Sequence, residues 1–334
     1  MSLEIIRPGL LTTVQDLGRF GYQSAGVVVS GALDAVALRQ ANLLVGNAQH
    51  AAGLEITLLG PRIRFAAAHL IALAGADLAA TLNGQPVGLN RPVGVGAGAE
   101  LAFGRPVAGS RAYLAVAGGV AVAPVLGSRA TYLRAGLGGL HGRSLRAGDQ
   151  LPVGEPSLAG EKIRQAIGAH KQSAATWVQA TWAAGWWPYP AHRPHYLRAM
   201  PGPEYEQFSA SSQRAFWEET FCVSPQADRM GYRLLGPDLQ RTTSAELLSS
   251  AVTAGTVQVP AGGQAIVLLA DCQTTGGYPR LAQVITADLG ALAQLRPGQQ
   301  FQFAAVTLAQ AQALYLAQER RLRALQRAIE LKIR

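Results

Sequence analysis

Cysteine is scarce in this chain, whose 334 residues include only Cys222 and Cys272, and neither belongs to a CxxC pair. Two isolated thiols exclude a disulfide framework and a cysteine-based zinc site, and they are typical of a reducing compartment. His192 and His195 are three residues apart in a proline-rich stretch, where the helical spacing of a metal pair is missing. We therefore expect no metal site.

Charge and long apolar runs are also in short supply. Charged residues make up 15% of the chain and hydrophobic residues 49%, whereas charged residues are roughly 25% of an average soluble domain. The longest uncharged run, residues 112–128, is broken by two glycines and Pro124, so it reads as strands and a turn. The N-terminus carries Glu4 and Arg7 where a signal peptide needs apolar residues. We expect a soluble, cytoplasmic protein that buries some apolar surface against a partner.

The net charge of +9 comes from 29 basic and 20 acidic residues scattered along the chain. A basic run interleaved with aromatic residues is missing outside the last turns of the chain, so we expect no binding of nucleic acid. Net charge affects steering, and a positive chain attracts anionic substrates.

Glycine and proline are abundant instead, at 38 and 18 residues, and they punctuate short apolar runs. Such runs predict a strand pair over 54–65 broken at Gly60–Pro61, and further strands over 70–74, 93–103, 112–122 and 266–270. Short strands at close spacing favour a barrel or a sandwich over alternating βαβ units. The fold class is therefore mainly β.

Four helices are expected. Asp34 can cap a helix that runs to about Val45, and Ser209 can cap a second one through Glu219. A short helix is expected over 160–169. The tail from 308 to 334 has apolar residues spaced by threes and fours and is rich in arginine, which is typical of an amphipathic helix that docks on its own protein.

A faint duplication predicts two related β-barrel domains. Ser30-Gly-Ala-Leu-Asp34 precedes a strand that runs into Asp77, and Ser224-Pro-Gln-Ala-Asp228 precedes one that runs into Asp271 at the same spacing. We expect an N-terminal barrel over 1–155, a Trp- and Pro-rich connector over 156–195, a C-terminal barrel over 196–306 and a basic helical tail over 307–334. The tryptophans of the connector are expected to pack on a domain face or on a partner.

Standard catalytic signatures are missing. The stretch from Gly136 to Ser144 resembles a phosphate loop, but Leu137 stands where the first glycine is needed and Arg143 where the lysine is needed. We interpret it as a turn-rich connection. A GxSxG elbow is absent from the sequence.

The segment from Asp271 to Arg280 is the strongest candidate site, because it leaves an apolar strand and is rich in polar groups. We expect Arg280 to clamp an anion, Gln273 and Thr274 to contact an amide, and Asp271 to act as a positioning acid. The remaining candidates of the segment are Thr275, Gly276, Gly277 and Tyr278. The two glycines would let backbone N–H groups approach a ligand and would permit positive φ. The alternative is a tight turn between strands.

Two further clusters and one acid could bind substrate. Gln15 and Arg19 lie beside a glycine turn, Arg229 lies in a loop with Gly231, and Glu55 is an acid inside an apolar strand. Either arginine could instead pair with an acid and stabilise the fold.

Taken together, these segments resemble the biotin-dependent carboxyltransferase family, also known as allophanate hydrolase subunit 2-like or KipA-type, which includes the C subunit of 5-oxoprolinase (PxpC). The resemblance covers nearly the whole chain. The segments are Thr12-Thr-Val-Gln-Asp-Leu-Gly-Arg19, Ser30-Gly-Ala-Leu-Asp34, Ala41-Asn-Leu-Leu-Val-Gly-Asn47, Leu54-Glu-Ile-Thr57, Tyr113-Leu-Ala-Val-Ala-Gly-Gly119, Gly136-Leu-Gly-Gly-Leu140, Pro201-Gly-Pro-Glu204, Asp228-Arg-Met-Gly-Tyr-Arg-Leu234 and Gln273-Thr-Thr-Gly-Gly-Tyr-Pro-Arg280.

The resemblance implies two cyclophilin-like β-barrel domains with a few short helices and a C-terminal helix. It also implies work as the C subunit of a bacterial ATP-dependent 5-oxoprolinase, inactive without an allophanate hydrolase subunit 1-like chain (PxpB or KipI type) and a LamB/YcsF-type chain (PxpA). ATP would be used by the complex, at a site that the sequence does not locate. Two alternatives stay open: a carboxyltransferase subunit served by biotin on a separate carrier, and a KipA-type regulatory binding protein. Cys272 stands where a small inert residue is expected, so we predict no nucleophilic thiol.

Overall fold

The computed structural model describes residues 2–169, 176–185, 195–243 and 246–333, and the chain divides into two compact units. The first unit comprises Met1–Arg19, Asp34–Tyr189 and Arg320–Arg334, and the second comprises Phe20–Leu33 and Pro190–Glu319. The units are thus interleaved along the chain, unlike the contiguous domains predicted from the sequence. Two of the connector's tryptophans, at 186 and 187, and His192 lie outside the described residues.

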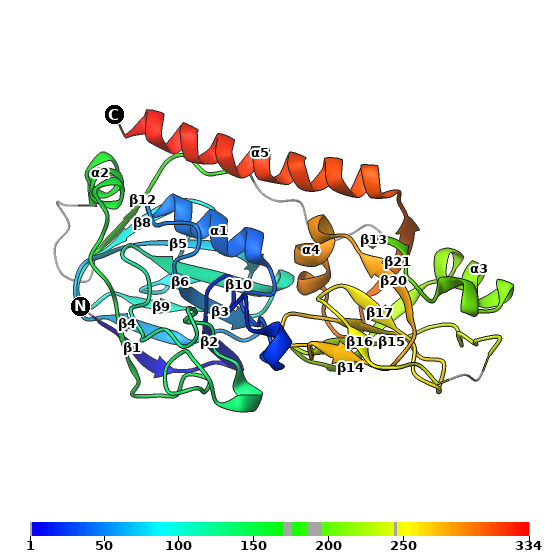
Figure 1. Ribbon diagram of the computed structural model, residues 1–334. Coiled ribbons are helices and arrows are strands. Elements are labelled where there is room, and N and C mark those ends of the chain that lie inside the picture. Colours follow the sequence, from blue (N-terminus) through cyan, green and yellow to red (C-terminus); the bar gives the residue numbers. More distant parts are fainter. Residues whose placement is uncertain (1, 170–175, 186–194, 244–245, 334) are drawn as a thin grey trace. The chain divides into compact units, whose positions relative to one another are not determined.

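The first unit contains two six-stranded sheets around one apolar core (Figure 1). One sheet has the order β11-β1-β4-β9-β6-β7, and its strands are β11 (Gln150–Pro152), β1 (Ser2–Arg7), β4 (Arg62–Phe65), β9 (Glu100–Ala102), β6 (Thr81–Leu82) and β7 (Gln85–Pro86). The other has the order β12-β8-β5-β10-β3-β2, and its strands are β12 (Trp177–Gln179), β8 (Pro92–Val95), β5 (His69–Asp77), β10 (Ala108–Val116), β3 (Gly53–Thr57) and β2 (Leu11–Gln15). Here the structure has two sheets where the sequence predicted a single barrel.

The sheet that contains β2, β3 and β10 has one apolar and one polar face. Val14, Leu54 and Leu114 occupy one row of the register and belong to the core. Successive side chains of a strand point to opposite faces, so the next row, Thr13 opposite Glu55 and Glu55 opposite Tyr113, faces away from that core. Helix α1 (Ala35–Leu44) packs against β5 and β10.

The second unit is built on a closed barrel with the order β13-β20-β17-β18-β15-β14-β21. Its strands are β13 (His195–Pro201), β20 (Arg280–Val284), β17 (Thr256–Gln258), β18 (Ile266–Leu268), β15 (Gly231–Leu235), β14 (Phe221–Ala227) and β21 (Gln300–Ala305). Phe216 and Phe303 stack in its core with ring centroids 4.4 Å apart. Leu33 joins this core, so the segment 20–33 is part of the second unit. Outside the barrel, β16 (Ser250–Ala251) and β19 (Thr275–Gly276) form a two-stranded sheet.

The predicted helices are confirmed. Asp34 caps α1 by accepting the Ala37 N–H, and Ser209 caps α3 (Ala210–Glu218) by accepting the Ser212 N–H. Helix α2 (Leu158–Ala166) begins two residues before the predicted start, and α5 (Leu308–Lys332) forms the basic tail. The structure adds α4 (Leu289–Gln294), which is too short for a periodic pattern to reveal.

The mainly β class with a barrel and a C-terminal helix is confirmed. Within the described ranges, the helices lack the combination of length and apolarity that crossing a bilayer requires.

Candidate functional site

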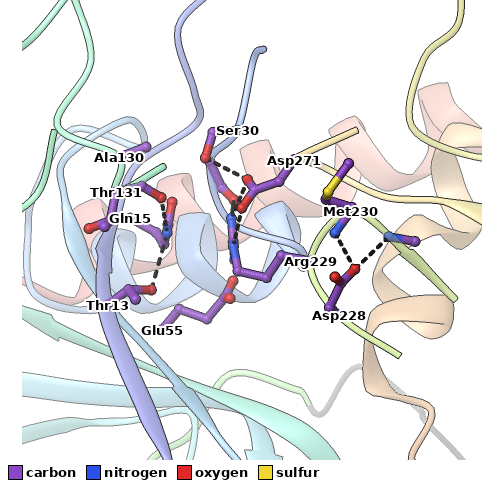
Figure 2. Close-up of polar contacts among 12 residues, drawn as sticks. Thr13, Gln15, Ser30, Glu55, Ala130, Thr131, Asp228, Arg229, Met230 and Asp271 are labelled. Carbon is purple, nitrogen blue, oxygen red and sulfur yellow. Dashed lines mark hydrogen bonds and ion pairs between the residues drawn. The ribbon is translucent and has the colours of Figure 1, made fainter. Parts of the chain in front are cut away.

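Asp271 and Arg229, both predicted site residues, form a buried ion pair in the second unit (Figure 2). Arg229 donates from Nε and Nη2 to the two carboxylate oxygens of Asp271 at 2.9 and 3.1 Å. Asp271 also accepts a 2.7 Å hydrogen bond from Ser30 Oγ, and Arg229 Nη2 donates to the Gly31 carbonyl at 2.6 Å. The pair therefore holds the segment 20–33 to the barrel, and a role for Asp271 as a positioning acid stays a prediction.

Gly276 and Gly277 follow Asp271 in a segment that pairs as β19 with β16. Because the strand is extended, neither glycine adopts the positive φ that the sequence suggested. A Cβ at Gly276 would lie 2.7 Å from Nε2 of the buried Gln258, so this glycine makes room for a neighbouring side chain of the protein itself. Thr275 opposes Ala251 in the same small sheet, and the Thr274 carbonyl accepts the Val252 N–H at 3.1 Å.

Arg280 lies at the start of β20 and is paired with Glu204. Its Nε and Nη2 donate to the two oxygens of Glu204 at 2.9 and 2.7 Å, and Nη1 reaches the Ala251 carbonyl at 3.2 Å. The hydrogen bonds from Arg280 lower the pKa of Glu204, and Glu204 in turn raises the pKa of Arg280. An anion could be clamped here only by sharing or displacing Glu204.

A hollow of about 810 Å³ lies beside this segment. Gly277 and Tyr278 line one side, and Asp238, Arg241 and Glu246 bring charges of both signs to it. Tyr278 is 51% exposed, so its ring is accessible to a ligand. The volume is in the range of small-molecule sites, roughly 300–1,000 Å³. Of the predicted residues, Gly277 and Tyr278 are the ones in this lining.

In the first unit, Gln15 and Arg19 bind the segment 128–131. Gln15 Nε2 donates to the Thr131 carbonyl at 3.0 Å, and Arg19 Nη2 donates to the Ala130 carbonyl. Asp16 completes the attachment, because its carboxylate accepts from Ser128 Oγ and from the Arg129 N–H. These three side chains therefore hold the glycine-rich stretch that follows, a role that the sequence could not distinguish from ligand binding.

That stretch is a built turn, as the sequence indicated. The N–H groups of Gly136, Gly139 and Gly142 donate to carbonyls of the chain. Arg143 donates to both oxygens of Asp149, at 2.7 and 2.8 Å. A phosphate group of ATP would need these same donors, so the stretch does not fit a phosphate site.

Glu55 and Tyr113 are joined on the polar face of the sheet. The Tyr113 hydroxyl donates to Glu55 Oε2 at 2.8 Å and accepts the Asp34 N–H at 2.7 Å. Burial, and then the charge of Glu55, raise the pKa of Tyr113, which keeps the hydroxyl protonated as a donor. Sequence reasoning missed Tyr113 as a site residue, because its position opposite Glu55 follows from strand register.

Cys272 is buried, and burial raises the pKa of its thiol to about 11, with the charge of Asp271 adding to the effect. A thiol at neutral pH is a poor nucleophile, which agrees with the expectation of an inert residue. In the parts of the chain that the structure describes, three His, Cys, Asp or Glu side chains do not gather into a metal-binding group.

Several known proteins resemble the chain. The family model of the carboxyltransferase domain, subdomain A and B, matches residues 25–305. The C subunit of the 5-oxoprolinase of Escherichia coli is 44% identical over 312 residues, which cover 92% of this chain and 93% of that protein. The corresponding 5-oxoprolinase chain of Haemophilus influenzae is 39% identical over 316 residues, which cover 93% and 95%. The crystal structure of the K. lactis urea amidolyase superposes with a TM-score of 0.85 at 29% identity, over 97% of this chain and 20% of that one.

Proposed function

Because this chain belongs to the family of carboxyltransferase domains with subdomains A and B, we propose that it is the C subunit of a 5-oxoprolinase. Such an enzyme opens 5-oxoproline with ATP and water to give glutamate, ADP and phosphate. One observation carries this conclusion: the identity with the C subunit of the E. coli 5-oxoprolinase extends over 92% of this chain and 93% of that protein. The two chains therefore correspond along almost their whole length.

A protein of this kind works with other chains, and we propose two of them. They are an allophanate hydrolase subunit 1-like chain (PxpB or KipI type) and a LamB/YcsF-type chain (PxpA), in a cytoplasmic hetero-oligomer. The low content of charged residues, 15%, supports burial of apolar surface against a partner. ATP is a co-substrate of the complex in this proposal, and the glycine-rich stretch from Gly136 to Ser144 is not its site.

Two polar regions of this chain are available for substrate. The second unit offers the hollow beside Gly277 and Tyr278, with Arg280 and Glu204 at the base of the same segment. The first unit offers the polar sheet face with Gln15 and Glu55. Both carry acceptors and donors at fixed positions, which suits recognition of a small cyclic amide with a carboxylate.

The test is ADP release from the complex assembled by co-expression with both partner chains. We expect release that depends on 5-oxoproline and that disappears when this chain is omitted. Release that persists without this chain would contradict the proposal.

The second candidate is a carboxyltransferase subunit that accepts a carboxyl group from carboxybiotin. It is supported by the similarity in fold to the K. lactis urea amidolyase. The chain has no Met-Lys-Met sequence, so biotin would sit on a separate carrier. An assembled complex without 5-oxoproline turnover, but with avidin-sensitive carboxylation of an amide, would favour this candidate. Failure to assemble would favour a regulatory binding protein.

A further inference from the structure

Gln15 has a buried amide whose two ends are treated differently by the protein. The residue ends β2 and has no exposed surface. Its Nε2 donates to the Thr131 carbonyl at 3.0 Å and to Thr13 Oγ1 at 3.1 Å (Figure 2). Its Oε1 meets no donor anywhere in the described part of the chain.

The orientation of this amide is determined by Thr131. A backbone carbonyl can only accept, so the end of Gln15 that faces it must be the NH₂ group. Rotating the amide by half a turn would place two oxygens against each other and would leave the donors unused. The orphan atom is therefore the carbonyl oxygen, an acceptor.

A buried acceptor without a donor is rare in native proteins and calls for an explanation such as a ligand. The missing partner must supply an N–H or an O–H group. The surroundings of Gln15 have the same preference, because Thr13 lies opposite Glu55 in the register and shares its face of the sheet. Diagonal neighbours on one face are about 7–8 Å apart, so Gln15 and Glu55 are close enough to flank one small ring.

The one strongly basic side chain on this face of β10 is farther away. Arg111 lies opposite Thr57, and Thr57 lies opposite Leu11. That row is separated from the row of Gln15 by the row of Glu55. Around Gln15 the face therefore attracts hydrogen-bond donors and repels carboxylates.

We propose that Gln15 Oε1 accepts the ring N–H of 5-oxoproline and thereby orients the amide that is to be opened. The inference rests on the proposed function and adds a recognition contact to it. The ring N–H is the only donor of 5-oxoproline at neutral pH. Its carboxylate points away from Glu55 in this arrangement, because two negative charges on one face repel.

The test compares 5-oxoproline with its oxygen analogue, 5-oxotetrahydrofuran-2-carboxylate, in which a ring oxygen replaces the N–H. Binding of both compounds to the assembled complex is measured at equilibrium for the wild type, for Gln15→Met and for Asp16→Asn. The wild type is expected to bind the lactam ~100-fold or more tightly than the lactone, because a site built to accept an N–H rejects an analogue without it. In Gln15→Met the ratio should fall to within ~10-fold.

Asp16→Asn is the matched control, since Asp16 holds the same segment through Ser128 and Arg129 but does not touch the Gln15 amide. It should change both affinities alike and leave their ratio unchanged. If Gln15→Met does not assemble, Gln15→Asn is used, which keeps the amide but withdraws it by one carbon and should also lower the ratio.

A ratio in the Gln15 variants equal to that of the wild type would overturn the inference. A ratio in the wild type within ~3-fold of unity would overturn it as well. A wild-type complex that neither binds 5-oxoproline nor releases ADP with it would instead overturn the proposed function, and the inference with it.

Discussion

At the residue scale, Arg280 holds both oxygens of Glu204, and the two side chains are 22% and 12% exposed. We expect Arg280→Ala to lower turnover of the assembled complex by about 100-fold, because a partly buried charged contact contributes about 2–4 kcal/mol. ADP release with 5-oxoproline measures the effect.

The control for this prediction is Glu204→Gln, which breaks the same ion pair but leaves the guanidinium in place. If Arg280 clamps an anion, Glu204→Gln keeps most of the activity. Equal losses in both variants would show that Arg280 only holds Glu204 and that the segment is a structural turn.

Also at the residue scale, the raised pKa of Cys272 predicts its reactivity. The thiolate forms only as the pH approaches about 11, so native protein at pH 8 should react with an aromatic disulfide reagent at Cys222 and not at Cys272. In urea both thiols should react, because unfolding removes the burial that raises the pKa. Cys272→Ser should leave the native reaction unchanged, and a clear loss of native signal in that variant would contradict the prediction.

At the element scale, the glycine-rich stretch offers a matched pair of substitutions. Gly136 and Gly142 both have positive φ, at 63° and 67°, but a Cβ at Gly136 meets nothing within 4 Å, whereas one at Gly142 would lie 1.9 Å from the Gly136 carbonyl oxygen. Gly136→Ala should therefore reduce the free energy of unfolding by about 1 kcal/mol. Gly142→Ala should cost about 3 kcal/mol, because backbone must move.

Urea denaturation of the two variants measures this difference. Equal midpoints would mean that the stretch relaxes without cost and that it does not depend on the attachments made by Gln15, Asp16 and Arg19.

At the scale of the whole molecule, the ion pair of Asp271 and Arg229 connects parts that are far apart in sequence. Both side chains are almost fully buried, at 5% and 6% exposure. Asp271→Asn should reduce the free energy of unfolding by about 3–5 kcal/mol, because it leaves Arg229 charged and buried without its partner. Glu161→Gln, which breaks a pair with Arg164 that is about one-third exposed, should cost less than about 1 kcal/mol.

Hydrogen exchange gives this prediction a spatial form. Because the Ser30 N–H donates to the Ala270 carbonyl, amides of residues 28–33 and 266–271 should exchange faster together in Asp271→Asn. Amides of β2 should be unchanged, since β2 belongs to the first unit. A uniform rise along the chain would contradict the assignment of residues 20–33 to the second unit.

The elements of this protein were predictable where a local pattern specifies them. Asp34 and Ser209 cap helices as predicted, since a cap depends on residues three or four apart. The strand pair broken at Gly60–Pro61 is also found, as β3 and β4. Helix α4 was missed because six residues are too few to show a period.

The amino-acid sequence by itself determined the family, the mainly β class, the caps and the set of polar residues from which any site must be drawn. The tertiary structure decided which partners those residues have. Glu204 binds Arg280 across 76 residues, and Glu55 meets Tyr113 across 58. Such contacts depend on strand register and on how the chain closes long loops. Local periodicity carries no information about either, because a shift of one residue turns every side chain to the opposite face.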